Sequence, residues 1–483
     1  MKIAIIGAGI AGCTAYLELQ KHLPEATGDH EIIIYEAYKD IDPSSEQRDG
    51  DEEEHSDPST LLVGGGLGIA PNGLNVLRRL DPDLLKSVVR GGYVVSTSNL
   101  KNKHGSLLMS LKSHVSSASE ENIDTQKMHM VASSRHAFWK ALRARIPDAQ
   151  IINKRVREVV PDAEKRNIVH FVDDSAPVEA DLVIGADGVR STTKRAIFAD
   201  AEEDSYLPHY EGLVGVGGFI PTTEVRDLVE KGSMNFIFGG NGFFGYFFAD
   251  SAVAAANRDS PYHISEPGEL LAWWSTYAIE ECPNGKTLDM ADVTRQLRER
   301  HAYWKDPVVQ KVIQSIRVQN MYPTWTSPPL RTWERDGVVL VGDAAHALPS
   351  SSGQGSSQAL EDVEALALFL AHYLRAECQD KEHQRKDDEE NEDCVAKAQK
   401  RAIMTAAKQY INLRQPRVTE ILENAQKMQS TKRDMGLLQE YSMYAVMKII
   451  GWFPSLMTDQ IRRVNEYNVA DHVAQVLSEL GSN

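Results

Sequence analysis

The fold is decided by the stretch Lys2-Ile3-Ala4-Ile5-Ile6-Gly7-Ala8-Gly9-Ile10-Ala11-Gly12, in which an apolar, strand-like run leads directly into the pattern G-x-G-x-x-G. Each glycine has a steric task in such a turn. Gly7 permits the tight bend after the strand, Gly9 lets the backbone approach a pyrophosphate, and Gly12 lets the following helix pack closely against the sheet. The pyrophosphate then lies at the helix N-terminus, where free N–H groups and the helix dipole favour negative charge.

The second strand-like run ends in an acidic residue. Ile32 to Tyr35 is mostly aliphatic and leads to Glu36, which follows Gly12 by 24 residues. A carboxylate at this point accepts hydrogen bonds from the ribose hydroxyls of adenosine and disfavours a 2′-phosphate. We therefore predict a dinucleotide site, in preference to a glycine turn that binds no ligand.

A second match to the same glycine pattern, Gly240 to Gly245, is interpreted differently. It lies between two aromatic-rich runs, Met234 to Phe238 and Phe243 to Phe248. Two such runs joined by Asn-Gly are typical of a β-hairpin, so Asn241-Gly242 is predicted to form its turn.

Composition places the chain among globular proteins of more than one domain. It has 483 residues, of which 42% are hydrophobic and 25% charged. The excess of 69 acidic over 52 basic residues gives a net charge of -17, which argues against nucleic acid and anionic membrane surfaces as partners. Much of this charge is concentrated in two segments, Glu46 to Asp57 and Glu377 to Asp393, which are predicted to be solvated insertions.

The four cysteines, Cys13, Cys282, Cys378 and Cys394, are widely spaced and form no C-x-x-C motif. They indicate neither a disulfide framework nor a zinc site, and we predict no metal site and a reducing compartment, the cytoplasm. The apolar N-terminus is not interpreted as a signal peptide, because cleavage near residue 12 would destroy the glycine turn. No run of 18 apolar residues exists, so no transmembrane segment is predicted.

Strands and helices alternate at both ends of the chain, with a sheet-forming region between them. Buried strands are predicted at Asp181 to Gly188 and at Val338 to Val341. The glycine- and aromatic-rich segment from Tyr210 to Phe248 predicts an antiparallel sheet. A long helix is expected from Ser356 to Leu374, and a mostly helical pattern from Ala396 to Leu480.

The predicted fold is therefore α/β, with a discontinuous Rossmann-like domain, a β-sheet substrate domain and a helical C-terminal region. The expected boundaries are 1–87, 128–200 and 322–375 for the dinucleotide-binding domain, 88–127 and 201–321 for the substrate domain, and 376–483 for the acidic insertion with the helical region.

Two further constellations follow predicted strands. The strand at 338–341 leads to Gly342-Asp343 and His346, and then to Gly353-Gln354-Gly355 at the start of a helix. A carboxylate at a strand end suits a sugar-alcohol hydroxyl, and the N–H groups of the glycine turn suit an electron-rich ring edge. His346 is expected to make a structural hydrogen bond beside the ligand. The other constellation, Asp187-Gly188, ends a strand expected beside the first turn.

Taken in this order, the motifs resemble those of the FAD-dependent aromatic-hydroxylase family of flavoprotein monooxygenases, which includes salicylate-, urate- and para-hydroxybenzoate-hydroxylase-like enzymes. The resemblance covers most of the first 375 residues and includes Arg135 in Ser134-Arg135-His136-Ala137-Phe138. The residues alone indicate a dinucleotide without choosing between FAD and NAD, and the resemblance implies FAD. The residues that it implies in cofactor binding are Gly7, Gly9, Gly12, Glu36, Arg135, Asp187, Gly188, Gly342, Asp343, Pro349, Gly353, Gln354 and Gly355.

The family also implies roles for single residues. Glu36 is expected to bind ribose, Arg135 to contact FAD, and Asp343 to contact the ribityl chain. The backbone after Pro349 is expected to face the pyrimidine edge of the flavin. The element Asp187-Gly188 is implied in contacts with both FAD and the nicotinamide cofactor.

The implied activity is hydroxylation or epoxidation of a bulky aromatic or polycyclic small molecule, as in secondary metabolism. NADPH or NADH reduces the flavin, O2 adds to give a C4a-hydroperoxide, and the terminal oxygen passes to an electron-rich substrate. Two other hypotheses remain open. One is a reductase or another flavin oxidoreductase of the same fold, although the W-x-W-x-x-I pattern of flavin halogenases is absent. The other is a non-catalytic FAD-fold binding protein.

The substrate is expected to lie between the flavin and the sheet of the second domain. Strand alternation places Phe236 and Phe238 on one face of their strand, and it likewise groups Phe244, Tyr246 and Phe248. Phe238 and Tyr246 are therefore candidates for the pocket, with the Tyr246 hydroxyl as a polar handle. The alternative is that these aromatic residues only fill the core between the domains.

Gly217 is the third candidate for the pocket. Similar urate- and salicylate-type hydroxylases often carry arginine at the corresponding point of the strand. Leu213, Gly215, Gly217 and Phe219 are expected on one face, so the two glycines would leave space for a larger, neutral molecule. The alternative is that the glycines only permit a bulge or a close approach of two strands.

Overall fold

The computed structural model describes residues 1–24, 30–38, 65–113, 127–284, 287–384, 392–453 and 455–481. The predicted acidic insertion at 46–57 lies outside these residues. The other acidic segment is helical wherever it is described, because one long helix continues to Gln384 and the next begins at Glu392.

The first layer is a six-stranded sheet with the order β18-β19-β12-β1-β2-β8. Neighbouring strands are parallel except for β18 and β19, and the apolar run Ile3 to Ile6 is buried between β12 and β2. Burial on both faces explains why this strand is continuously apolar rather than alternating. The strands are β1 (Lys2–Ile6), β2 (Glu31–Glu36), β8 (Ile151–Asn153), β12 (Leu182–Gly185), β18 (Glu334–Arg335) and β19 (Val338–Leu340).

Helices and two small sheets surround this layer. Ser134 begins α4 by accepting a hydrogen bond from the Ala137 N–H, as an N-cap serine does. The helices are α1 (Ile10–His22), α2 (Pro71–Leu80), α3 (Pro82–Arg90), α4 (Arg135–Arg143) and α5 (Thr192–Ile197). The small sheets are β3 (Gly66–Ile69), β7 (Met130–Ser134) and β4 (Gly92–Val95), and β11 (Val178–Ala180), β10 (Asn167–Phe171) and β9 (Val156–Val160).

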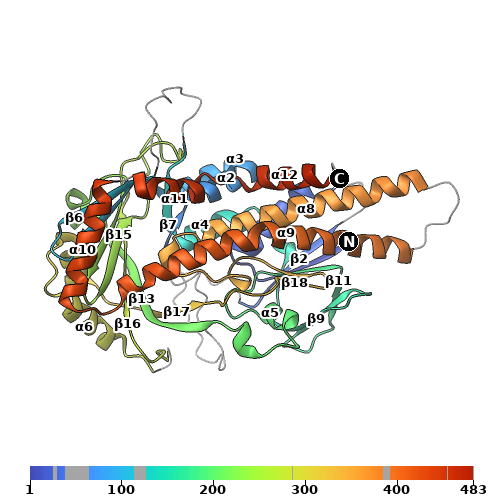
Figure 1. The fold of residues 1–483 in the computed structure, drawn as a ribbon, viewed down its shortest axis with the longest axis horizontal. Coiled ribbons are helices and arrows are strands. Elements are labelled where there is room, and N and C mark those ends of the chain that lie inside the picture. The colour runs from blue at the N-terminus through green and yellow to red at the C-terminus, as the bar shows by residue number, and fades with distance from the viewer. Residues whose placement is uncertain are drawn as a thin grey trace.

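A seven-stranded sheet forms the other end of the molecule (Figure 1). All neighbouring pairs are antiparallel except β14 and β5. Its strands, in spatial order, are β17 (Met321–Thr326), β13 (His209–Pro221), β16 (Leu270–Ala278), β15 (Gly242–Phe248), β14 (Ser233–Gly239), β5 (Thr97–Asn102) and β6 (Leu107–Lys112). Side chains of α6 (Met290–His301) and α7 (Pro307–Ser315) pack with one face of this sheet in a single apolar cluster.

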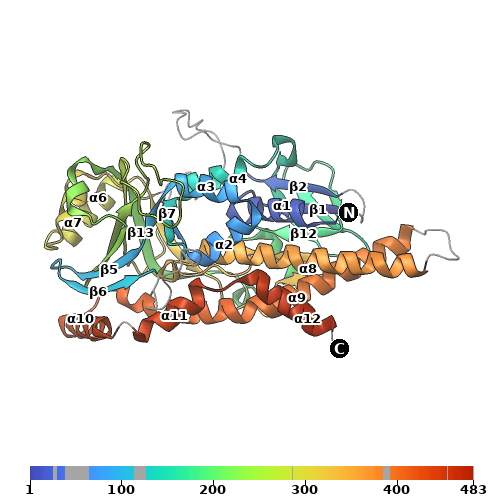
Figure 2. The same ribbon diagram turned by 90° about the horizontal axis from the view of Figure 1, so that it is seen from above.

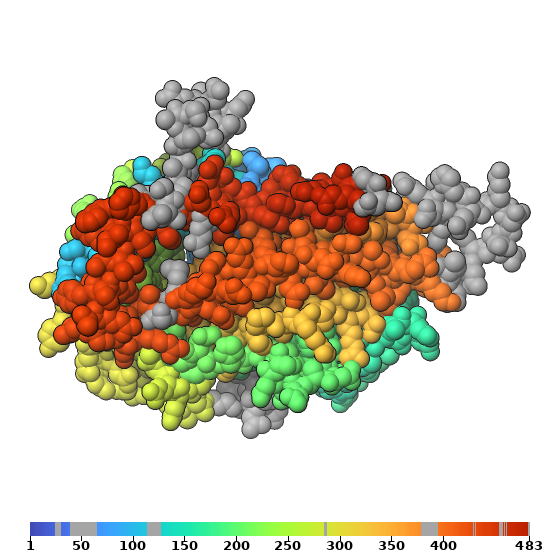
Figure 3. Space-filling view, in the orientation of Figure 1, coloured from blue at the N-terminus to red at the C-terminus, as the bar shows by residue number. Residues whose placement is uncertain are grey.

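The C-terminal helices connect the two ends. The helices α8 (Gly355–Gln384) and α9 (Glu392–Gln429) pack against each other along the long axis of the molecule (Figures 1 and 2). They are followed by α10 (Leu437–Trp452), α11 (Ser455–Asn465) and α12 (Val469–Gly481). The space-filling view shows that α9 to α12 cover much of one face (Figure 3). The C-terminal region therefore touches both sheets.

The predicted fold class is confirmed, with differences at boundaries. The strand β17 pairs with β13 of the seven-stranded sheet, whereas the expected boundary assigned residues from 322 onward to the dinucleotide-binding domain. The hairpin predicted between the aromatic-rich runs exists, but Gly239 pairs with Gly242, so its two loop residues are Gly240 and Asn241. The expected helix at 356–374 is ten residues longer at its C-terminal end because α9 packs along it.

Candidate active site

Four predicted motifs follow the carboxyl ends of four adjacent parallel strands. In the order β19-β12-β1-β2, these ends lead to Asp343, Asp187, Gly7 and Glu36. Crevices at the carboxyl ends of parallel strands are where such sheets bind ligands. The fold thus brings together residues that are more than 300 positions apart in the sequence.

The first turn has the geometry of a dinucleotide cradle. Gly7 has a φ of +100°, and a Cβ atom added to Gly12 would lie 1.9 Å from the Gly7 carbonyl oxygen. Both positions therefore exclude a side chain. By contrast, a Cβ atom added to Gly9 would meet no described atom within 4 Å. Gly9 thus faces open space that a diphosphate group would fill.

Glu36 lies beside this turn at the end of β2. Its carboxylate accepts hydrogen bonds from the Ala8 N–H at 2.6 Å and from the Tyr38 N–H at 2.9 Å. Trp139 donates its indole N–H to the Ala8 carbonyl oxygen at 2.8 Å, which holds the turn against α4. The half-buried carboxylate is fixed in direction before a ligand arrives, because two backbone groups orient it.

The carboxylate of Asp187 is bonded to other groups of the protein. Its carboxylate accepts hydrogen bonds from the Ser191 hydroxyl at 2.5 Å, the Thr193 N–H at 3.0 Å and the Thr193 hydroxyl at 3.1 Å. Burial raises the pKa of Asp187 despite these bonds. The residue orders the start of α5, and the neighbouring Gly188, with a φ of +77° and no described atom near its Cβ position, presents backbone to open space.

Lys194 is a site residue that the sequence analysis missed. Its side chain is 1% exposed, and its ammonium lies 3.3 Å from both the Val189 carbonyl and the Ser327 hydroxyl. Burial lowers the pKa of Lys194 to about 8, although the charges of Asp187 and Asp343 oppose this change. Because a single lysine in a loop-helix turn carries no pattern, only the fold reveals that it lies between two predicted motifs.

The third motif presents an exposed carboxylate and an open helix start. Gly342 has a φ of +58°, and Asp343 beside it is exposed. A Cβ atom added to Gly353 or to Gly355 would have no described atom within 4 Å. Space is therefore open beside the glycine turn at the start of α8, where the ring-edge contact is predicted.

A buried polar network supports this loop from behind. His346 and Asp362 lie 2.5 Å apart, and Asp362 also accepts hydrogen bonds from the Gly342 N–H and from Arg414, both at 3.0 Å. Burial opposes ionisation of Asp362, but His346 and Arg414 outweigh it and hold the pKa of Asp362 below its usual value. The structural role expected for His346 is what the geometry shows.

The same network reaches the start of α8. Arg414, which is fully buried, also pairs with Glu361, and Glu361 accepts a hydrogen bond from Asn72 at 2.6 Å. Asn72 donates in addition to the Gln354 side chain at 3.0 Å. The Gln354 side chain is thus directed into the protein, so any contact of Gln354 with a ligand has to come from its backbone.

Arg135 lies at the junction of the two ends of the molecule. Its backbone N–H donates to the Gly65 carbonyl at 3.1 Å. Its positive charge acts on Tyr322 of β17, where burial raises the tyrosine pKa to about 12 and Arg135 opposes that change. Tyr322 of β17 pairs with Gly215 of the neighbouring strand β13. Arg135 is therefore close to the sheet face that carries Gly215.

The structure corrects the expectation for Tyr246. Its hydroxyl donates to Asp306 and accepts from Lys101, each at 3.1 Å, on the face of the sheet that α6 and α7 cover. The residue is 1% exposed. Tyr246 therefore provides no polar handle for a substrate, since its partners are protein groups on the outer face.

Phe238 is also buried against protein. It packs with Leu100, Phe243 and Tyr444 in the cluster between the sheet and α10 and is 4% exposed. Its carbonyl oxygen accepts a hydrogen bond from the Tyr444 hydroxyl at 2.8 Å. These contacts agree with the alternative that this residue fills the core.

A different set of aromatic side chains lies on the face directed toward the dinucleotide-binding end. Trp274 contacts Phe236, Phe243 and Phe247, with ring centroids 5.7 to 5.9 Å apart. Phe247 approaches β3 so closely that a Cβ atom on Gly66 would lie 2.5 Å from its ring. Phe236 and Trp274 remain half-buried. We call these four residues the aromatic face.

Gly217 pairs with Trp274 on this face, but its missing side chain opens no space. An added Cβ atom would lie 2.8 Å from the Trp273 carbonyl oxygen and 3.2 Å from the Trp274 Cβ atom. The structure therefore supports the alternative at this position, namely close approach of two strands. An arginine there would strain the backbone, so it would not be a clean test of pocket size.

Comparisons with known proteins agree with this geometry. Residues 143–402 match the model of a family described as the FAD binding domain, which is more than half of the chain. The chain belongs to the FAD-dependent aromatic-hydroxylase family. Among the curated relatives, 6-hydroxynicotinate 3-monooxygenase of Pseudomonas fluorescens is 24% identical over 375 residues, which are 76% of this chain and 82% of that protein.

Further similarities cover most of the chain. Aurachin C monooxygenase/isomerase of Stigmatella aurantiaca is 25% identical over 316 residues, 65% of this chain and 72% of its own. The structure of Klebsiella pneumoniae HpxO complexed with FAD and uric acid superposes with a TM-score of 0.67 at 20% identity, and covers 95% of this chain and 96% of that one. The chain is thus an FAD-dependent monooxygenase, and the family predicted from the sequence is confirmed.

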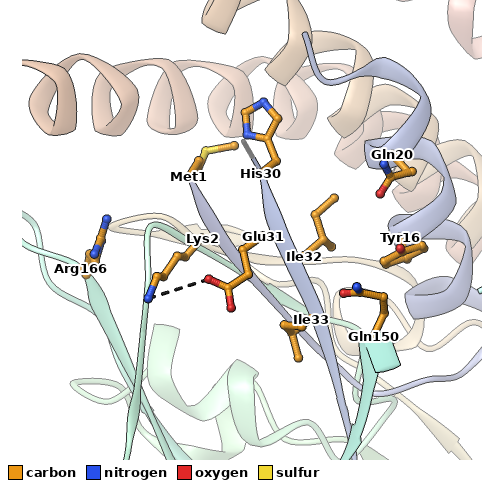
Figure 4. Close-up of a pocket in the computed structure, with 10 residues that line it drawn as sticks. All are labelled: Met1, Lys2, Tyr16, Gln20, His30, Glu31, Ile32, Ile33, Gln150 and Arg166. Carbon is orange, nitrogen blue, oxygen red and sulfur yellow. Dashed lines mark ion pairs between the residues drawn. The ribbon is translucent and has the colours of Figure 1, made fainter. Parts of the chain in front are cut away.

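One pocket of this monooxygenase lies away from the site. Its volume is about 580 Å³, and Figure 4 shows Lys2 and Glu31 among its lining residues as an ion pair, with Nζ and Oε2 3.9 Å apart. These residues begin β1 and β2, so the pocket is at the amino ends of the strands. Because ligands of such sheets bind at the carboxyl ends, we do not assign it to the cofactor.

Metal binding and membrane spanning were considered for the residues that the structure describes. No group of three or more His, Cys, Asp and Glu side chains is arranged to hold a metal ion. In that same part of the chain, no helix is both long and apolar enough to cross a membrane.

Proposed function

We propose that this monooxygenase uses NADPH or NADH and O2 to hydroxylate or epoxidise a bulky aromatic or polycyclic small molecule, as in secondary metabolism. Bound FAD supplies the redox chemistry, taking a hydride from the nicotinamide and delivering one oxygen atom of O2 to the substrate. The observation that carries the proposal is the aromatic face, which lies on the side of the seven-stranded sheet that packs against β3.

Residues at the four strand ends have distinct roles in this proposal. The open cradle at Gly7, Gly9 and Gly12 binds the pyrophosphate, and Glu36 binds the ribose hydroxyls. Asp343 is the exposed carboxylate that binds the ribityl chain. The described geometry fits FAD because space is left open where the diphosphate and ring edge would lie.

The remaining predicted residues complete the site. Arg135 binds FAD at the junction with β17, and the backbone after Pro349 and at Gly353 to Gly355 faces the pyrimidine edge. The N–H groups at the start of α8 stabilise negative charge on that edge. Asp187 acts by ordering the turn, so that the Gly188 backbone contacts the cofactors.

The aromatic face suits flat, apolar molecules. Rings stack or meet edge-to-face at the centroid distances found among these side chains, and such contacts add to the gain from burying apolar area. Enclosure by both sheets and α9 would also exclude water, which otherwise promotes wasteful release of peroxide. The name of the relative 6-hydroxynicotinate 3-monooxygenase supports an aromatic substrate, although that compound has one ring and a carboxylate.

The test is oxidation of NADPH and NADH by the purified protein with bound FAD, with and without a panel of aromatic and polycyclic compounds. We expect at least one polycyclic compound to accelerate oxidation. Acceleration without an oxygenated product would indicate a reductase. Failure of every compound to accelerate oxidation would support a binding protein instead.

We place the protein in the cytoplasm. Among the described residues, neither the buried Cys13 nor the exposed Cys282 is in a disulfide, as is usual in a reducing compartment. Fractionation of cells that produce the protein tests this, and recovery in an oxidising compartment would contradict it.

A further inference from the structure

The end of α9 and the turn after it carry two polar side chains into the interior, beside the aromatic face. Gln429 is 4% exposed and Lys432 is 6% exposed. The Lys432 ammonium lies 3.2 Å from the Ser350 hydroxyl and 5.3 Å from the centroid of the Phe243 ring. Ser350 directly follows Pro349, so Lys432 lies between the proposed flavin loop and the aromatic face.

Packing of the surrounding elements gives the same location. The turn Ser430–Lys432 contacts β14, β15 and β16, whose side chains form the aromatic face. One turn before Gln429, the Ala425 carbonyl accepts a hydrogen bond from the Ser351 hydroxyl at 3.0 Å. The end of α9 therefore closes the space between the loop and the sheet.

Lys432 has no anionic partner among the described residues. Burial alone lowers the pKa of its ammonium to about 8. Two nearby lysines are paired, since Lys101 of β5 lies 3.6 Å from Asp306 and Lys103, which follows β5, lies 2.8 Å from Glu440. A buried ammonium with only a hydroxyl and a ring beside it is costly unless an anion completes the site.

Gln429 supplies an independent observation. Neither its amide nitrogen nor its amide oxygen has a hydrogen-bond partner in the described part of the chain, although both atoms are buried. Buried polar groups of native proteins are almost always hydrogen-bonded, so an exception indicates a missing ligand or water. Gln429 ends α9 and Lys432 ends the helical turn that follows, and residues three positions apart in such turns lie on the same side, so we infer that the two side chains are neighbours.

We propose that Gln429 and Lys432 form the part of the substrate pocket that binds an anionic oxygen of an aromatic substrate, either a carboxylate or an ionised ring hydroxyl. The ammonium of Lys432 pairs with the oxygen, and the Gln429 amide donates a second hydrogen bond. The Phe243 ring, next to Lys432, contacts the substrate ring. The inference rests on the proposed function and specifies its substrate class.

This assignment changes the expectation of a neutral substrate. Gly217 places no charge on the sheet. Lys432, from the turn after α9, places a positive charge beside Phe243 of that sheet. A pocket whose polar group comes from the C-terminal helices selects a substrate by one charged edge and leaves the rest of the molecule to the aromatic face.

The test measures binding to the FAD-loaded protein at pH 7 by isothermal titration calorimetry. Three probes share one skeleton, namely 2-naphthoate, 2-naphthol and 2-methoxynaphthalene. The variants are Lys432→Met and Gln429→Leu. The control is Lys427→Met, which removes the same charge from an exposed position on α9. Flavin content and circular dichroism establish that each variant is folded.

We expect the wild type to bind 2-naphthoate or 2-naphthol about tenfold more tightly than the ether, because hydrogen bonds to charged groups contribute at that level. Whichever of the two binds more tightly identifies the source of the oxygen as carboxylate or ring hydroxyl. Lys432→Met should abolish the preference and leave binding of the ether within about twofold. Gln429→Leu should weaken the preference, and Lys427→Met should retain it.

An unchanged preference in Lys432→Met would overturn the inference. So would a wild type that binds all three probes equally, or that binds none of them at millimolar concentration. These outcomes are distinct from failure of the proposed function. A neutral polycyclic compound that is oxygenated efficiently would contradict the role of Lys432 and still support monooxygenation.

Discussion

At the scale of single residues, Glu36 connects the sequence pattern most directly to cofactor binding. Its carboxylate is held by the N–H groups of Ala8 and Tyr38. We expect Glu36→Ala to weaken FAD binding by roughly ten- to a hundredfold, because the lost charged hydrogen bonds contribute about 1.5 to 3 kcal/mol. Titration of the apoprotein with FAD measures this. Glu31→Ala on the same strand is the control, and equal FAD affinity of the two variants would refute the assignment.

Lys432 predicts a pH dependence of stability at the same scale. Burial lowers its pKa from 10.5 to about 8, so between these values the unfolded chain binds more protons than the folded chain. The free energy of unfolding should therefore rise with pH in this window, by up to about 3 kcal/mol from this residue. Urea unfolding of wild type and Lys432→Met from pH 7 to 10.5 measures the difference. Parallel curves for the two proteins would show that Lys432 is not buried as a charge.

Residues could be predicted from the sequence where local spacing fixes their positions, and could not where packing of distant elements does. Gly7, Gly12 and Glu36 follow from local spacing, since a strand, a turn and a helix fix their relations. The face on which Tyr246 lies depends on what covers each side of the sheet, and α6 and α7 come from a later part of the chain. Lys432 was missed because its burial depends on packing between α9 and two distant elements.

At the scale of elements, the pair α8 and α9 stabilises the loop that carries Asp343. Arg414 of α9 is fully buried and pairs with Glu361 and Asp362 of α8. We expect Arg414→Met to lower the free energy of unfolding by about 3 to 5 kcal/mol, because Glu361 and Asp362 are both buried and would each lose a cation, keeping only Arg417 and His346. It should also weaken FAD retention, since Asp362 holds the Gly342 N–H.

Arg401→Met is the matched control on the same helix. Arg401 pairs with Glu377 and is 67% exposed, so its loss should change stability by less than about 1 kcal/mol. Chemical denaturation of both variants and measurement of bound flavin compare them. Similar stabilities for the two variants would contradict the role given to the buried network.

The extent of these helices was predicted only in part. The apolar pattern gave the start of α8 near Ser356, but acidic residues after Glu377 suggested a solvated insertion. The helix nevertheless continues to Gln384, and it packs on α9. Composition alone does not distinguish a charged helix face from a loop.

At the scale of the whole molecule, the proposed site draws on both sheets and the C-terminal region. In this proposal the strand ends of the six-stranded sheet bind the cofactor, the seven-stranded sheet supplies the aromatic face, and the turn after α9 supplies Lys432. The sequence suggested the first contribution and the sheet that carries the second, and both stay predictions. It did not predict the third, since the C-terminal region was expected to be helical without a role in the site.

The central claim is that this monooxygenase transfers one oxygen atom of O2 to an aromatic small molecule. The most direct measurement is mass spectrometry of the product formed from a compound that accelerates NAD(P)H oxidation, under 16O2 and under 18O2. We predict a product heavier than the substrate by one oxygen atom, with the label following O2 and not water. A product without oxygen from O2, or NAD(P)H oxidation that yields only peroxide for every compound tested, would contradict the account.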